Sequence, residues 1–239
     1  RCHSGGIVGQ SPRDQRLSMD GLRLDILVNA APLLMEGLWV TIKVSLLSFM
    51  LALFIGLLVG VLRSRSELHR RLLAPYVEVF RGTPLLIQLF FIYYGLPSLG
   101  ITMNNMTAGV VGLALNGGAY ISEIIRGALV SVCRGQLDAA FALGFSWSRA
   151  MLHVILPQAI SVAIPPLVNS FSALLKESSL VSVLAITELT RVSQLVYTRT
   201  FRAFEVYLAV GALYLIMTYT ASRLSTFLER RFRVSGRIQ

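Results

Sequence analysis

The sequence predicts an all-α integral membrane protein with about five transmembrane helices. Hydrophobic residues make up 54% of the 239 residues and charged residues only 14%, whereas soluble proteins carry about 25% charged residues. Two long runs, residues 44–62 and 82–122, contain no charged residue. Since one span needs about 20 apolar residues, the chain has room for five spans joined by short loops.

The first three spans lie in the N-terminal half. Residues 38–62 form the first, with only Lys43 as a charge. The run 82–122 is long enough to cross twice, and Pro, Gly and Asn residues at 97–107 predict the turn between the two crossings.

The C-terminal half supplies two more spans. Residues 154–175 form the fourth, although three prolines soften it, and residues 206–222 form the fifth. The apolar segment 178–186 is too short to cross, so we expect a re-entrant or lid segment there.

The distribution of arginines orients the chain in the membrane. We assign the net charge of +10 to loops on the cytoplasmic side rather than to nucleic-acid binding. This orientation predicts a polar extracytoplasmic tail at 1–29, a transmembrane domain at 30–232 and a cytoplasmic tail at 233–239. The loop 136–157 then lies in the cytoplasm. The arginines counted are Arg63, Arg65, Arg70, Arg71, Arg134, Arg149, Arg230, Arg231, Arg233 and Arg237.

The loop 136–157 predicts a helical elbow that another protein can grip. Residues 137–143 favour a helix, Gly144 suits a left-handed stop, and Ser146 can cap the helix that follows. Ala139 and Ala140 are small, which permits close approach of another surface. Such an elbow on a membrane protein is typical of a docking element through which a partner drives movement.

Signatures of catalysis, nucleotide binding and metal binding are absent from the sequence. The two lysines, Lys43 and Lys176, do not end a glycine-rich phosphate loop. The three histidines lack metal-ligand spacing, and no serine lies in a G-x-S-x-G elbow. We therefore expect no catalytic residue, no metal site and no cofactor in this chain.

Polar residues inside the spans are candidates for a solute pathway. Glu123 and Arg126 lie one helical turn apart and can pair. Asn169 lies seven residues before Lys176, on the same helix face, and Glu177 follows directly. Ionisable groups at such depths usually face a bundle interior or a wet pathway, but a helix-end ion pair or a snorkelling side chain is the alternative for Lys176 and Arg126.

Four motifs together resemble one transporter family. Asp-Ala-Ala at 138–140 with Gly144 and Ile-Leu-Pro at 155–157 is similar to the cytoplasmic EAA loop of ABC importer permeases. The stretches 81–88 (Arg-Gly-Thr-Pro-Leu-Leu-Ile-Gln), 116–127 (Asn-Gly-Gly-Ala-Tyr-Ile-Ser-Glu-Ile-Ile-Arg-Gly) and 174–180 (Leu-Leu-Lys-Glu-Ser-Ser-Leu) resemble the polar amino acid permeases (His/Glu/Gln/Arg/opine and cystine). The resemblance covers about residues 30–232.

The resemblance implies that residues 30–232 are a permease domain with the type I ABC importer fold and cytoplasmic coupling helices, in the bacterial cytoplasmic (inner) membrane. The implied partners are a second permease copy or related permease, two cytoplasmic ATP-binding subunits that use ATP and Mg²⁺, an extracytoplasmic solute-binding protein, an amino acid substrate and membrane lipid. The implied ATPase-coupling residues are Asp138, Ala139, Ala140, Leu143, Gly144, Ser146, Leu156 and Pro157. The candidate substrate-pathway residues are Asn116, Tyr120, Glu123, Asn169, Lys176, Glu177 and Ser178.

Two motifs depart from the family pattern, and alternatives stay open. Asp138 replaces the usual loop glutamate, and Lys-Glu-Ser-Ser at 176–179 replaces Lys-Asp-Thr-Ser. The alternative functions are a self-sufficient carrier or channel and a membrane scaffold without a pathway. Which amino acid is carried, and whether the two permeases are identical, stays open.

Overall fold

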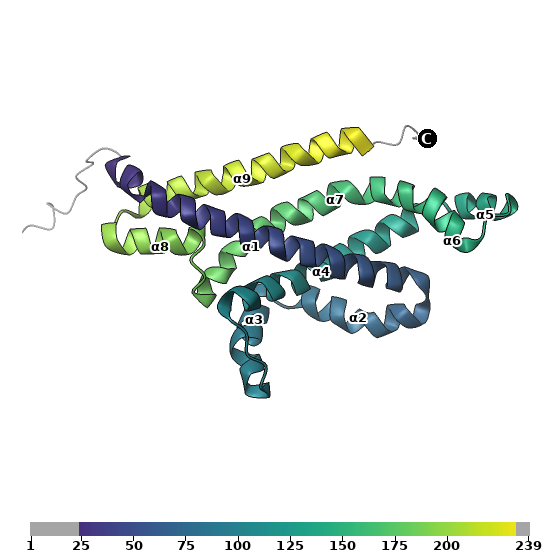
Figure 1. Cartoon of the computed structure of the whole chain (residues 1–239), viewed down its shortest axis with the longest axis horizontal. Helices are drawn as coiled ribbons and strands as arrows, with labels where there is room; N and C mark the ends of the chain where they lie inside the picture. Colours follow the sequence, from purple (N-terminus) through teal and green to yellow (C-terminus); the bar gives the residue numbers. More distant parts are fainter. Residues whose placement is uncertain (1–23, 233–239) are drawn as a thin grey trace, which may run out of the picture.

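The computed structural model describes residues 24–232, and this part of the chain is helical, without a strand (Figure 1). The tail predicted at 233–239 and residues 1–23 of the tail predicted at 1–29 lie outside the described residues, and residues 24–29 belong to the first helix. The elements are α1 (Leu24–Arg65), α2 (Glu67–Gly82), α3 (Leu85–Phe90), η1 (Phe91–Gly95), η2 (Leu96–Leu99), α4 (Asn105–Ser131), α5 (Arg134–Ala142), α6 (Trp147–Ala150), η3 (Met151–Ile155), α7 (Leu156–Glu177), η4 (Ser178–Leu184), α8 (Leu189–Thr200) and α9 (Ala203–Phe232).

Four helical segments are long and apolar enough to span a membrane, and the count rises to five if a bent helix pair is one span. The four are 25–65, 105–131, 147–184 and 203–224. The fifth consists of α2 followed by α3 to η2, which bend by 108° at their junction. The structure thus contains the predicted number of spans only if the second is broken.

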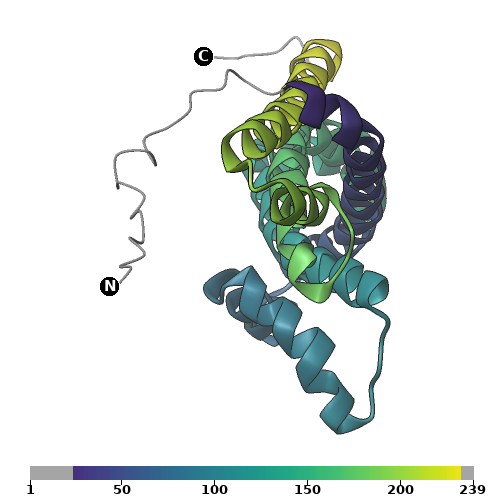
Figure 2. The same ribbon diagram turned by 90° about the vertical axis from the view of Figure 1, so that its left-hand side faces the viewer.

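The break lies at Thr83 and Pro84, at the start of the uncharged run 82–122, and proline explains it. Thr83 ends α2 in an extended conformation, and Pro84, which has no N–H, starts α3. The free carbonyls at the end of α2 are then satisfied by side-chain amides. Gln88 donates to the oxygens of Phe80 (2.9 Å) and Thr83 (3.0 Å), and Asn116 from α4 also donates to Phe80 (2.9 Å). Figure 2 shows the segment from α3 to η2 standing away from the bundle.

The core of the bundle is the contact between α1 and α4. Gly56 and Gly60 of α1 lie against residues 118–125 of α4, where there is no room for a side chain. At Gly60 an added Cβ would lie 2.7 Å from the carbonyl oxygen of Ser122 and 2.9 Å from Cβ of Ile125. Small residues at such positions let helix backbones approach closely in a membrane.

A buried glutamate joins three helices at the end of the bundle that carries α8. Glu188 is fully buried and caps α8 by accepting from the backbone N–H groups of Thr190 and Arg191, both at 2.8 Å. It also accepts from the hydroxyls of Tyr214 in α9 (3.1 Å) and Thr41 in α1 (3.4 Å). A buried carboxylate is stable only when several hydrogen-bond donors surround it. These hydrogen bonds of Glu188 therefore hold α8 against α1 and α9.

Candidate functional site

The elbow predicted at 136–157 consists of α5 and α6 and lies at the opposite end from α8 (Figure 1). Gly144 has φ +80°, the left-handed conformation that the sequence predicts. Its N–H donates to Phe141 (2.9 Å), and the N–H of Phe145 reaches back to Ala140 (3.0 Å). This pair of bonds is the Schellman closure of a helix end, so the bend is fixed by its own backbone.

Ser146 occupies the position that caps α6, but its hydroxyl makes no capping hydrogen bond. Its backbone is extended and its carbonyl accepts the first helical bond, from Ala150, at 2.9 Å. The predicted place is therefore confirmed, and the predicted side-chain bond is not formed.

The elbow exposes large apolar side chains. Leu143 is 78% exposed, and Phe141, Phe145 and Trp147 are between 37% and 49% exposed. Asp138 and Ala139 also lie on the outside, whereas Ala140 is buried, so only one of the two alanines is free to meet another surface. The remaining coupling candidates lie at the start of α7, where Leu156 is half-buried and Pro157 exposed.

A cavity of about 200 Å³ lies between α1, α4 and α7 and unites three of the predicted pathway residues. Asn116 and Tyr120 reach it from α4, and Glu177 from the end of α7. Glu177 is the one charged residue of the lining, which consists of Phe49, Asn116, Gly117, Tyr120, Ile121, Ser170, Ala173, Leu174 and Glu177.

The other four pathway candidates do not line this cavity. Glu123 forms ion pairs with Arg126, as predicted, and with Arg63. Ser178 is buried, and its hydroxyl donates to the oxygen of Leu175 at 2.8 Å. Asn169 and Lys176 are exposed elsewhere on α7.

The sequence does not predict two contacts made by residues beside the cavity. The Arg81 guanidinium lies 5.2 Å from the ring centre of Tyr120, which is a cation–π distance. Asn116 donates to Gln88 Oε1 (3.0 Å) as well as to Phe80, so its amide also holds the broken span in place. Both partners, Arg81 and Gln88, belong to the motif at 81–88, which was the available signal.

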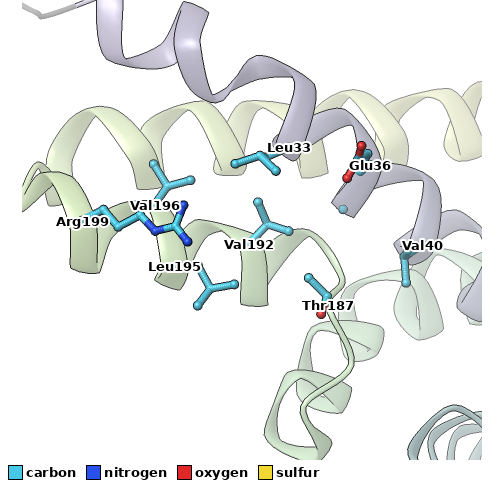
Figure 3. A pocket seen from close by; sticks show the side chains of 9 residues that line it. Leu33, Glu36, Val40, Thr187, Val192, Leu195, Val196 and Arg199 are labelled. Carbon is cyan, nitrogen blue, oxygen red and sulfur yellow. The ribbon is translucent and has the colours of Figure 1, made fainter.

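A second cavity, of about 260 Å³, lies between α1 and α8 (Figure 3). Its walls are mainly aliphatic, including Leu33 and Val192, with Glu36 and Arg199 as the charged members. None of the predicted site residues lines it.

Comparison with known proteins gives consistent matches. Residues 52–234 match the family model described as "Binding-protein-dependent transport system inner membrane component". The glutamine transport system permease protein of Escherichia coli (strain K12) is 39% identical over 208 residues, which is 86% of this chain and 95% of that protein. The L-cystine transport system permease protein of Bacillus subtilis (strain 168) is 37% identical over 202 residues, 84% of this chain and 86% of that protein.

Solved structures match as well. A crystal structure of an amino acid ABC transporter with histidines aligns with a TM-score of 0.83 at 40% identity, covering 88% of this chain and 99% of that chain. The inward-facing MetNI methionine ABC transporter aligns at 0.72 and 22% identity, covering 84% and 97%, which shows the shared fold alone. These matches confirm the predicted helical permease fold and the resemblance carried by the four motifs.

Proposed function

The chain belongs to the family of binding-protein-dependent transport system inner membrane components, and on this premise we propose that it is the permease subunit of an ATP-driven importer for a polar amino acid. Membership makes it an inner-membrane transport component, and ATP hydrolysis resides in a separate subunit in this family. The relatives that carry glutamine and cystine support an amino acid as the solute.

The observation that carries the coupling proposal is the exposed apolar elbow. Leu143 and Trp147 protrude from a bend that the backbone itself fixes. The arginine distribution puts this bend outside the lipid, so these exposed apolar side chains favour a partner protein that covers them. We assign the partner as one of two cytoplasmic ATP-binding subunits, which would hold ATP and Mg²⁺.

The elbow is connected directly to two walls of the cavity. It joins the end of α4 to the start of α7, and both helices line the cavity between α1, α4 and α7. A displacement of the elbow by the ATPase therefore moves those walls relative to α1. This is the kind of rigid-element shift that alternates access without chemistry in the chain itself.

The cavity suits a small zwitterion. The Glu177 carboxylate offers an acceptor for an ammonium group, and the Tyr120 ring, with Arg81 above it, offers an aromatic face beside a cation. We propose that solute reaches this cavity from an extracytoplasmic binding protein. A second permease, identical or related, completes the pathway.

Reconstituted proteoliposomes test the proposal. Uptake of labelled amino acids should require the ATPase, ATP and the binding protein, and competition among amino acids identifies the solute. Flux through this chain without its ATPase would instead support a self-sufficient carrier or channel and overturn the proposal.

Gly144→Val tests the elbow separately. A branched side chain at φ +80° is strained, so the bend should shift and uptake should be lost while membrane insertion stays intact. Gly211→Val is the matched control, because nothing lies within 4 Å of its added Cβ and its φ is not positive. Normal uptake by Gly144→Val would remove the elbow from the mechanism.

Glu177→Gln tests the cavity. If the carboxylate meets the solute ammonium, the substitution should raise the KM for uptake and leave co-purification of the ATPase unchanged. Glu67→Gln, a carboxylate on the exposed face of α2, is the control. An unchanged KM would place the pathway elsewhere.

A further inference from the structure

Three charged side chains form a cluster where α1 ends against α4. Arg63 in the last turn of α1 donates from Nη1 to Oε1 of Glu123. Arg126, one turn along α4, donates to the other oxygen, Oε2, from Nη2 (2.8 Å) and Nε (3.2 Å). The exposed fractions of the three side chains are 10% for Arg63, 21% for Glu123 and 33% for Arg126.

The cluster lacks one negative charge and one hydrogen-bond acceptor. Two guanidinium groups face a single carboxylate, which leaves a net charge of one positive unit in a largely desolvated place. Nε of Arg63 is buried and has no acceptor among the described residues. Because buried charges and buried N–H groups are costly when unpaired, the site favours binding of an anion.

The surroundings of the cluster match those of a lipid headgroup. The arginine distribution predicts that this end of α1 lies at the cytoplasmic surface, where anionic lipids attract basic residues. Arg65, two residues beyond Arg63, is exposed and adds a further positive charge at this end of α1.

We propose that the phosphate of an anionic phospholipid binds at the Arg63–Glu123–Arg126 cluster. The exposed edge of Arg126 is the entry point for the phosphate, and the added negative charge balances the second guanidinium. The lipid then closes the α1–α4 contact at its cytoplasmic end. Basic pockets between membrane helices on the cytoplasmic side recognise headgroups in this way.

The test uses the full chain assembled with its ATPase partner, freed of native lipid and titrated with short-chain phosphatidylglycerol or phosphatidylcholine. Native mass spectrometry counts the bound lipid. Phosphatidylglycerol should bind more tightly, and Arg126→Gln should weaken it about five-fold, the usual effect of one arginine at an anionic headgroup. Arg126→Lys, which keeps the charge, should retain most of the preference.

Arg70→Gln is the matched control, because Arg70 lies on the same side of the protein but is exposed and pairs with Glu67 on its own helix. It should leave the lipid preference unchanged. Arg63→Gln repeats the test from α1. If that variant fails to fold, Arg126→Gln decides the question, because its side chain is the more exposed of the two.

Three outcomes would overturn the proposal. The first is equal binding of the two lipids, or a preference that Arg126→Gln leaves unchanged. The second is binding of inorganic phosphate alone with the affinity of phosphatidylglycerol, which would assign a free anion. The third is binding to the isolated chain but not to the assembled complex, which would show that an acidic group of a partner subunit fills the site.

Discussion

The contact between α1 and α4 and the elbow formed by α5 and α6 use glycine for opposite purposes. In the α1–α4 contact, Gly60 is required because the backbone of α4 occupies the space of its side chain. In the elbow, Gly144 has open space around it and is required for its left-handed backbone. The first region buries its surface within the chain, and the second leaves Leu143 exposed.

The α1–α4 contact therefore serves the stability of the fold, whereas the elbow serves contact with a partner. The α1–α4 contact includes fully buried residues such as Ile121 and Ala52, and it needs no partner to exclude solvent or lipid. The elbow has a fixed shape but an unfilled apolar surface. Substitutions in the two regions should therefore affect different measurements: stability for the contact and subunit assembly for the elbow.

The largest expected effect is that of Gly60→Ala. The new methyl group would meet the carbonyl oxygen of Ser122 at 2.7 Å, and a backbone atom cannot rotate away, so the helices must separate. Overpacking of this kind costs about 1–3 kcal/mol. Thermal unfolding of the purified chain in detergent measures the loss.

Gly211→Ala is the control for that substitution. Nothing lies within 4 Å of its added Cβ, and Ala has the higher helix propensity by about 1 kcal/mol, so stability should stay the same or rise. If the two variants unfold at the same temperature, the α1–α4 contact is not the tight region that the structure shows.

Leu143→Glu should have the next largest effect, on assembly alone. The side chain is 78% exposed, so the charge costs the isolated chain little and its unfolding temperature should be unchanged. A charge in the centre of an apolar interface, however, should strongly reduce the amount of ATPase that co-purifies. Full retention of the ATPase would show that the coupling surface lies elsewhere.

The sequence predicts the elbow well and the cavity only in part, because the two depend on different information. The elbow rests on local signals, a helix-favouring run followed by Gly144, and its bend is closed by backbone bonds within six residues. The broken span depends instead on Pro84 together with amides from Gln88 and the distant Asn116. Side-chain partners so far apart in the sequence leave no periodic pattern to detect.

At the cavity, the seven-residue spacing along α7 holds, but the residues that line the cavity are shifted by one position for the first of the predicted pair, from Asn169 to Ser170, and for the second, from Lys176 to Glu177. Asn169 and Lys176, seven residues apart, share a face of α7 as predicted, but neither lines the cavity. Ser170 and Glu177 have the same spacing, and both line it. Spacing identifies which residues share a face, whereas only the rotation of the packed helix decides which face meets α1 and α4.

The smallest expected effect is that of Ser146→Ala, and it compares the capping of the two regions. Asn104 caps α4 in the bundle by accepting from the N–H of Thr107 at 2.7 Å, whereas the Ser146 hydroxyl makes no such bond to α6. Removing a capping side chain typically costs about 1 kcal/mol. Asn104→Ala should therefore lower the free energy of unfolding by about that amount, and Ser146→Ala should leave it unchanged within the error of denaturant titration. Equal losses in the two variants would mean that the serine hydroxyl caps α6 in solution, and that the elbow is stabilised by its side chains as well as by its backbone.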